Sequence, residues 1–494
     1  MPTELDPSKP SKEYVENIDR WRFIDHICDF KEVEQYLILP RPVEEDLPAG
    51  ERPTTDDDFR NKQYKKRAVF HKVAGNTVGG LLGLIYGTQP SIDLPNRLEG
   101  LKKNSDGCGT NLIQHSQLTT NQVIRKGRCG IWVDSPKSEK SYSKAETDAG
   151  KGLPRLSLFP AESVIDARFK EVDGQILLGS VRLAYKEEIE VNQFEVKEQD
   201  AILHLYLDDL NQYAIQRWIK NEDKWELKKD EVTGEDFVIP TNSKGAPWSY
   251  IPFFFGGSQN NNKDIDESPM LGICELNKAH FNNSAEYEDS LFICGQPQYW
   301  SSGISSQAIE DMEAKGVVLG SGTLFNVPKD QTLGIVQPEP NTMSRQGMLD
   351  KEQAMIAQGA HLITPGSANK TAAESKGEQR QSHSKASLIS ENIGDLYSNA
   401  LAAAGEYVGA EVDENVFVMN SDFVEETYTI ADLKNVAEKF QDRLIPVGDY
   451  HEFLKAIKMR DPESTIEDFL EELESTGNLL IGLEPEMEDV SINA

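Results

Sequence analysis

Side chains that could catalyse a reaction form few groupings in this chain. The sequence lacks the pattern G-x-x-x-x-G-K-[S/T], whose backbone amides hold nucleotide phosphates, so nothing predicts ATP hydrolysis. Gly316, Gly320 and Gly322 resemble a nucleotide loop, but Thr323–Val327 after them has the composition of a strand. A dinucleotide site needs a helix there, because the helix N-terminus holds the pyrophosphate. A hairpin turn is therefore the better interpretation.

Nucleophilic and metal chemistry have no stronger support. Neither the G-x-S-x-G elbow nor H-E-x-x-H occurs. The eight histidines are dispersed, and His280 and His383, on or next to the two main predicted helices, are expected to pack or to face solvent. The five cysteines have no C-x-x-C pair and no histidine at metal spacing, so we expect buried thiols. The sequence predicts no catalytic residue, no metal and no cofactor, and an enzyme is the weaker hypothesis.

The net charge of −32 is the strongest fact of composition. A chain this acidic repels nucleic acid on average, so tight binding by phosphate neutralisation is not expected. The same charge suits a surface past which DNA slides. No run approaches the ~18 apolar residues of a membrane span, and Met1–Asp6 does not resemble a signal peptide. We therefore expect a product of the cytoplasm.

One basic cluster lies in a predicted helix over Phe59–Gly87. Such a run is either a solvated helix face that pairs with acidic neighbours or a contact for nucleic acid or an acidic partner. The cluster consists of Lys62, Lys65, Lys66, Arg67, His71 and Lys72.

The longest predicted helix, Ser268–Cys294, separates a β-rich first half from a mostly helical second half. Ser268 can cap its first turn, and Pro269, which has no N–H, can take the first helical position. A helix of roughly 26 residues is about 39 Å long. The apolar stripe along this helix is narrow and is interrupted by small and polar residues. Such a stripe predicts packing against copies of the same helix in a ring, and the alternative is a surface helix of a large domain. The mixed stripe includes Ile273, Asn277, His280, Ser284 and Tyr287.

A polar segment, His361–Lys385, lies between two further predicted helices. It follows a helix over Thr342–Gln358 and precedes apolar residues at helical spacing from Ile389 to Val408. Small and polar residues with a little positive charge can touch phosphates without holding them. The predicted behaviour is sliding contact with DNA.

Short elements complete the pattern. Alternation of apolar and polar residues predicts antiparallel strands between residues 155 and 255, including Ile176–Tyr185 and Ala201–Leu207. Three short helices are predicted near the C-terminus, over Thr429–Arg443, Val447–Met459 and Ser464–Ser475.

This order of elements resembles the portal proteins of tailed bacteriophages, and local strings support the resemblance over roughly residues 55 to 460. None of the strings has a chemical mechanism of its own, so the resemblance rests on their order and spacing. The strings are Tyr64-x-x-Arg67-Ala68-x-Phe70 followed by Leu82–Tyr86 and Leu94-Pro95, then Asp106–Thr110, Gly127–Pro136, Pro154–Arg168 with Pro160-Ala161-Glu162, and Ser268–Leu271 through Asn277-x-x-His280.

The resemblance implies an α+β subunit of the portal type. Its implied parts are an N-terminal arm (1–58), a helical and mixed wing in two parts (59–170 and 297–345), a β-rich clip (171–262), a long stem helix (263–296), a tunnel helix, loop and helix (346–410), a small helical crown (411–483) and a disordered tail (484–494). The tunnel loop that touches DNA would include Ser367, Asn369, Lys370, Thr371 and Lys376. The stem would use Ile273, Asn277, His280, Ser284 and Tyr287.

The resemblance also implies the assembly and its partners. Portal proteins form a homo-oligomeric ring, usually a dodecamer, at one capsid vertex of the virion, and are assembled in the host cytoplasm. Double-stranded DNA enters through the ring during packaging and leaves through it at ejection. The implied partners are the major capsid protein, the terminase motor and then the head–tail adaptor, with no membrane. The alternatives are another ring-forming head–tail connector or tail protein and a cytoplasmic enzyme.

Overall fold

The structure is a computed structural model, and its residues form two compact units, 1–423 and 424–494, which are described separately. Ten α-helices and four antiparallel sheets occur among the described residues, which confirms the predicted α+β class. The described residues are 6–48, 51–135, 152–172, 174–222, 224–230, 234–295, 298–303, 305–307, 332–337, 342–363, 384–421, 430–442, 444–456 and 464–475, with residues 310, 314, 339, 423, 459 and 460.

A three-stranded sheet forms the centre of the first unit. Its middle strand β2 (Arg128–Asp134) pairs with β3 (Arg155–Pro160) on one side and β9 (Phe253–Gly257) on the other. Gly130 of β2 lies against the ring of Phe253, where a Cβ atom would come within 2.1 Å of a ring carbon. A larger residue at position 130 would therefore displace this ring.

Two helices cover this sheet. Helix α4 (Leu112–Lys126) begins at Asn111, whose side chain accepts from the Gln114 amide at 2.7 Å, and ends at Gly127 in the left-handed conformation. Helix α10 (Lys385–Val408) crosses both α4 and the sheet. The hydroxyl of the fully buried Tyr397 on α10 lies 2.6 Å from His115 Nδ1 of α4. Its burial raises its pKa well above the ordinary value, so it stays a neutral hydrogen-bonding group.

A second, five-stranded sheet is a simple meander. The strands β5 and β6 are longer than their neighbours. They pair with each other from Lys186 opposite Asp200 to Asn192 opposite Glu195, and this stretch lies beyond the residues where β4 pairs with β5 and β7 pairs with β6. The strands are β4 (Val164–Val172), β5 (Gln175–Asn192), β6 (Glu195–Leu207), β7 (Tyr213–Asn221) and β8 (Lys224–Leu227).

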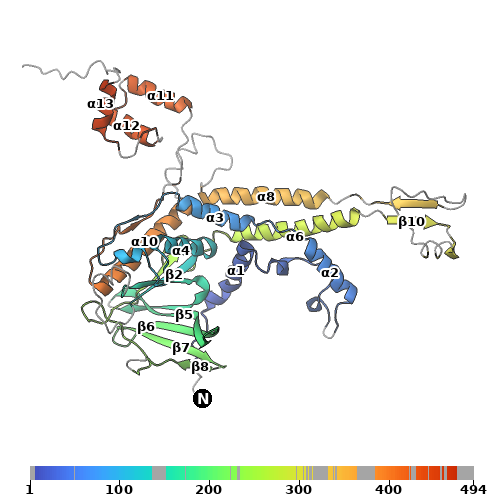
Figure 1. Ribbon diagram of the computed structural model, residues 1–494, viewed down its shortest axis with the longest axis horizontal. Coiled ribbons are helices and arrows are strands. Elements are labelled where there is room, and N and C mark those ends of the chain that lie inside the picture. Colours follow the sequence, from blue (N-terminus) through green and yellow to red (C-terminus); the bar gives the residue numbers. More distant parts are fainter. Residues whose placement is uncertain are drawn as a thin grey trace, which may run out of the picture. The chain divides into compact units, whose positions relative to one another are not determined.

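The remaining helices of the first unit pack around α6 (Leu271–Cys294), which contacts α1, α2, α3 and α8. In Figure 1, α6 and α8 run side by side, and the hairpin of β10 and β11 lies beyond one end of the pair. The other elements are α1 (Lys12–Asp29), α2 (Thr55–Arg67), α3 (Val73–Ile85), α8 (Thr342–Ile363), β1 (Ser91–Ile92), β10 (Gln298–Ser302), β11 (Thr332–Val336), β12 (Phe417–Val418), and the 3₁₀ helices η1 (Val33–Tyr36), η2 (Glu44–Asp46), η3 (Glu99–Lys102) and η4 (Ala161–Ser163).

The second unit contains the three predicted C-terminal helices. They are α11 (Ile430–Gln441), α12 (Val447–Ala456) and α13 (Ile466–Ser475), which confirms their existence within a few residues. Aromatic rings join them, because Phe440 stacks on Tyr450 at 4.0 Å between ring centres.

Several expectations about local structure were wrong. The single helix expected over Phe59–Gly87 is two helices, α2 and α3, with a break at residues 68–72. The long helix begins at Leu271, because Ser268 is in the turn before it, where its hydroxyl accepts from the Met270 amide and donates to the Arg125 carbonyl. Cys108 is exposed, while the other four cysteines are buried as expected.

Three domain boundaries taken from the resemblance also differ from the structure. Residues 12–29 of the expected arm form α1, whose Ile24, Ile27 and Cys28 are fully buried in the main core. β9, assigned to the clip, belongs to the central sheet. Residues 411–423 of the expected crown belong to the first unit, where β12 pairs with β1.

Candidate assembly and channel surface

The polar stripe of α6 is buried inside the chain itself. Ile273, Asn277, His280 and Ser284 are each at most 2% exposed, and Tyr287 is half-buried. From the sequence we expected identical neighbours to cover these residues, but helices of the same chain cover them. The narrow apolar stripe is therefore no argument for a ring.

Asn277 explains the break between α2 and α3. Its side-chain oxygen accepts from the Ala74 amide at 3.0 Å, and its amide group donates to the His71 carbonyl at 2.9 Å. The Ala74 amide is one of the first-turn donors of α3 that have no partner within the helix, and the His71 carbonyl, in the link before α3, also accepts from the Val73 amide at 2.8 Å. The amide side chain thus replaces the hydrogen bonds that a continuous helix would have made.

His280 joins α6 to α8. Its ring is fully buried, and Nε2 lies 3.1 Å from Glu352 Oε1. The ring of His71 lies 5.0 Å away, and Nδ1 has no hydrogen-bond partner among the described residues. Burial lowers the pKa of His280, an effect that His71 and Lys351 reinforce and Glu352 opposes. This confirms that His280 is a packing residue, and its ring is neutral at neutral pH.

An ion-pair cluster holds α2 on α6. Asp289 accepts from Arg60 Nη1 at 2.8 Å, from Arg60 Nη2, and from Arg67 Nη2 at 2.7 Å. The Arg67 guanidinium also lies 4.2 Å from the centre of the Phe292 ring. Burial alone would raise the pKa of Asp289, but the two arginines lower it below its ordinary value. The carboxylate is therefore ionised and fully used within the chain.

This cluster was not predicted from the sequence, although Arg60 and Arg67 lie seven residues apart on one helix face. The basic run turns out to serve two purposes. Arg67 pairs with an acidic neighbour, as one of the two interpretations expected. Lys62 and Lys66 are exposed on another face of α2.

One row of residues along the exposed side of α8 is uncharged, and the exposed Arg345 and Asp350 lie on either side of this row. Leu349 and Ile356 are 43% and 70% exposed, and the exposed Gln346 and Gln353 alternate with them at three-to-four-residue spacing. Ten residues of helix span about 15 Å. An uncharged, partly apolar stripe of that length is unusual on a chain with a net charge of −32. It suits either packing against another subunit or a wall that DNA passes without adhering.

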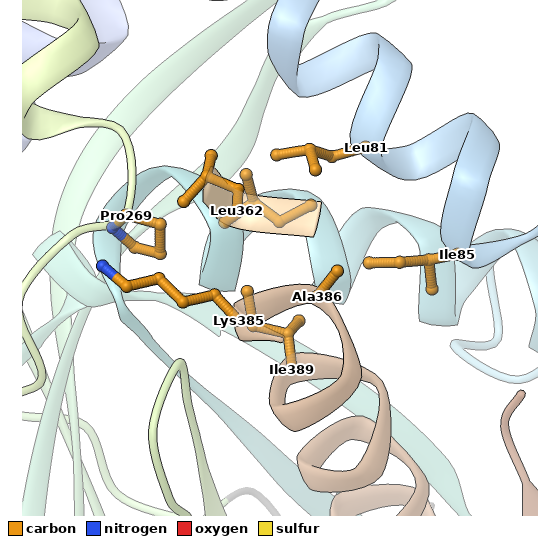
Figure 2. Close-up of a pocket in the computed structure, with 8 residues that line it drawn as sticks. Leu81, Ile85, Pro269, Leu362, Lys385, Ala386 and Ile389 are labelled. Atoms are coloured by element: carbon orange, nitrogen blue, oxygen red, sulfur yellow. The ribbon is translucent and has the colours of Figure 1, made fainter. Parts of the chain in front are cut away.

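The two ends of the predicted DNA-contacting segment are held at one place. The last turn of α8 and the first turn of α10 meet α3 and α4 around an apolar crevice (Figure 2). Ser384 begins α10 and accepts from the Ser387 amide at 3.0 Å. The lining residues are Leu81, Ile85, Ile124, Pro269, Leu362, Lys385, Ala386 and Ile389.

Several predicted residues lie outside the described part of the chain. They are Ser367, Asn369, Lys370, Thr371 and Lys376 of the tunnel loop, with His383 and the glycines at 316, 320 and 322. Within the described residues, no group of three His, Cys, Asp or Glu side chains could hold a metal ion. None of the described helices is long and apolar enough to cross a membrane.

Comparison with known proteins gives a family match for part of the chain and a likeness to chains of assembled particles. Residues 269–408, from the start of α6 to the end of α10, match a family described as a domain of unknown function (DUF4055). No curated protein matches the chain. A chain of the structure titled "Virion of native gene transfer agent (GTA) particle" is 10% identical, with a TM-score of 0.36, over 78% of this chain and 88% of that one. A chain of "Neck of empty GTA particle computed with C6 symmetry" is 10% identical, with a TM-score of 0.39, over 77% and 88%.

We predict that Asp289→Ala loosens α2 from α6. The substitution leaves two partly buried guanidinium groups without their carboxylate, at a cost of about 3 kcal/mol in the free energy of unfolding. Amide hydrogen exchange should become faster across residues 55–67. The matched control is Glu275→Ala, which removes an exposed acid of the same helix. Equal exchange in both variants would show that the ion pairs do not hold α2.

His280 should make the protein less stable in acid. Because the folded state holds its pKa below the value of about 6.5 found in unfolded chains, the unfolded state binds the proton first as the pH falls. Stability is therefore retained above pH ~6.5 and lost below it. His280→Gln can still donate to Glu352 but cannot titrate, so its unfolding temperature should fall less between pH 7.5 and 5.5. Parallel decreases in the two proteins would contradict this assignment.

Proposed function

We propose that this chain is the subunit of a phage-type portal, a ring at one capsid vertex through which double-stranded DNA enters and leaves. The observation that carries the proposal is the arrangement around α8. Helix α8 exposes a row of uncharged residues between Arg345 and Asp350, and the same helix leads into a polar, weakly basic segment. The order of elements and the local strings of the sequence agree with this arrangement.

The charge distribution suits passage rather than binding. Phosphate affinity grows with the number of charges that a protein neutralises. The polar segment between α8 and α10 supplies Lys370 and Lys376, and the chain as a whole is strongly acidic. A ring of such subunits would offer DNA many weak contacts and no tight site.

No catalytic role is part of the proposal. DNA translocation would be driven by a separate terminase motor that docks on the ring, and a head–tail adaptor would replace it after packaging. The major capsid protein would surround the ring in the virion. Another ring-forming head–tail connector is the second candidate, and it differs in having no packaging function.

The first test is the mass of the assembled protein. Mass photometry and negative-stain electron microscopy of the purified chain should show closed rings of about a dozen copies, because the channel exists only between subunits. A species that stays monomeric at all concentrations, or a dimer, would contradict the proposal.

The second test concerns the polar segment. Lys370→Glu with Lys376→Glu should leave ring assembly unchanged and reduce DNA packaging, because phosphates would then meet added negative charge. The control is Lys244→Glu, which changes an exposed lysine in a turn outside this segment. Packaging equal to that of the control would show that the segment does not touch DNA, and the connector candidate would then be favoured.

A further inference from the structure

The distal part of strands β5 and β6 is a two-stranded ribbon. β4 pairs with β5 only up to Leu183, and β7 pairs with β6 only from Ala201, so residues 186–200 have no neighbouring strand in the described structure. An isolated two-stranded hairpin is marginally stable in water. A ribbon of this kind gains stability when another surface covers one of its faces.

One face of the ribbon combines acidic and apolar groups. Glu188, Glu190 and Val196 share this face, because successive residues alternate sides and Glu190 pairs with Val196. All three side chains are exposed. Phe194 at the tip is 96% exposed, which is unusual for a large aromatic side chain. Neither glutamate has an ion pair within the described residues.

The outward face of α2 carries two exposed lysines and an exposed phenylalanine, with the exposed Asp58 one turn before the first lysine. Phe59 is 63% exposed, and Lys62 and Lys66 follow it at spacings of three and four residues on the same face. Arg60 and Arg67 on the other side of the helix fix its orientation through Asp289. The lysines are therefore held outward, and no ion pair involves them in the described part of the chain.

We propose that the ribbon of one copy docks on α2 of a neighbouring copy, with Glu188 and Glu190 facing Lys62 and Lys66 and Phe194 packing near Phe59. This rests on the proposed ring. The two patches differ and complement each other, so each copy can offer its ribbon to one neighbour and its α2 to the other. Repetition of such a head-to-tail contact gives a ring when the rotation between neighbours closes, as the proposed portal requires.

A second copy fits these patches better than an unrelated partner. In a chain with a net charge of −32, most of the surface repels another copy. The exposed lysines of α2 relieve this repulsion where they meet the acidic ribbon. Complementary charges of this kind select the orientation of the partners and speed their association.

The test is a charge swap in the full-length chain. Glu188→Lys with Glu190→Lys should raise the concentration at which rings form by ~10-fold or more, and so should Lys62→Glu with Lys66→Glu, because each places like charges in contact. The four substitutions together should restore assembly to within ~3-fold of the original chain, because the pairs are re-formed with reversed sign. Mass photometry over a range of concentrations and salt measures this, and added salt should reduce the differences.

The matched control is Glu411→Lys with Glu414→Lys, which reverses two exposed acids outside the ribbon and should not be rescued by the α2 change. Equal unfolding temperatures confirm that the variants fold. Rings unaffected by either reversal, or a combined variant worse than both, would overturn this docking and leave the portal proposal standing. Loss of assembly from the α2 change alone, without rescue, would also overturn it and favour another partner for the lysines. An original chain that never assembles would contradict the portal proposal itself.

Discussion

The first unit depends on how α6 satisfies its own polar residues. The buried side of this long helix includes an asparagine, a histidine and an aspartate, and an unpaired buried polar group costs about 1–3 kcal/mol. Among the described buried side-chain atoms of α6, only His280 Nδ1 is left without a partner. Asn277 bonds to the backbone at the start of α3 and just before it, His280 contacts Glu352 of α8, and Asp289 binds α2. One helix thereby fixes the positions of three others, which is why they form a single unit.

Because helices of the same chain cover the polar stripe of α6, this stripe no longer indicates an oligomer. Burial patterns in a sequence show that a face is covered, but they cannot tell a neighbouring subunit from another helix of the same chain. The residues that remain open are different ones: the uncharged row along α8, the outer lysines of α2 and the ribbon of β5 and β6. In a ring, these surfaces and not the stripe on α6 would contact the neighbouring copies.

The sequence predicted elements whose signals are local. Helix α10 has a regular apolar stripe with a serine cap, and the three C-terminal helices have clear starts, so their positions were correct within a few residues. The break between α2 and α3 was missed because Asn277, 203 residues away from Ala74, determines it. The distal halves of β5 and β6 were missed because both faces are exposed there and leave no alternation of burial. The sequence named the polar residues of α6 but not their partners, which only tertiary contacts define.

The hairpin beyond the α6–α8 pair has a practical consequence. β10 and β11 pair residue by residue from Gln298 with Val336 to Ser302 with Thr332. Because paired strands hold opposite residues about 5 Å apart, whatever chain joins Ser302 to Thr332 begins and ends at almost the same point. Folded domains commonly have their own two termini close together at the surface. A fluorescent protein or an affinity tag could therefore be fused at this position as a handle for imaging, without pulling the two helices apart.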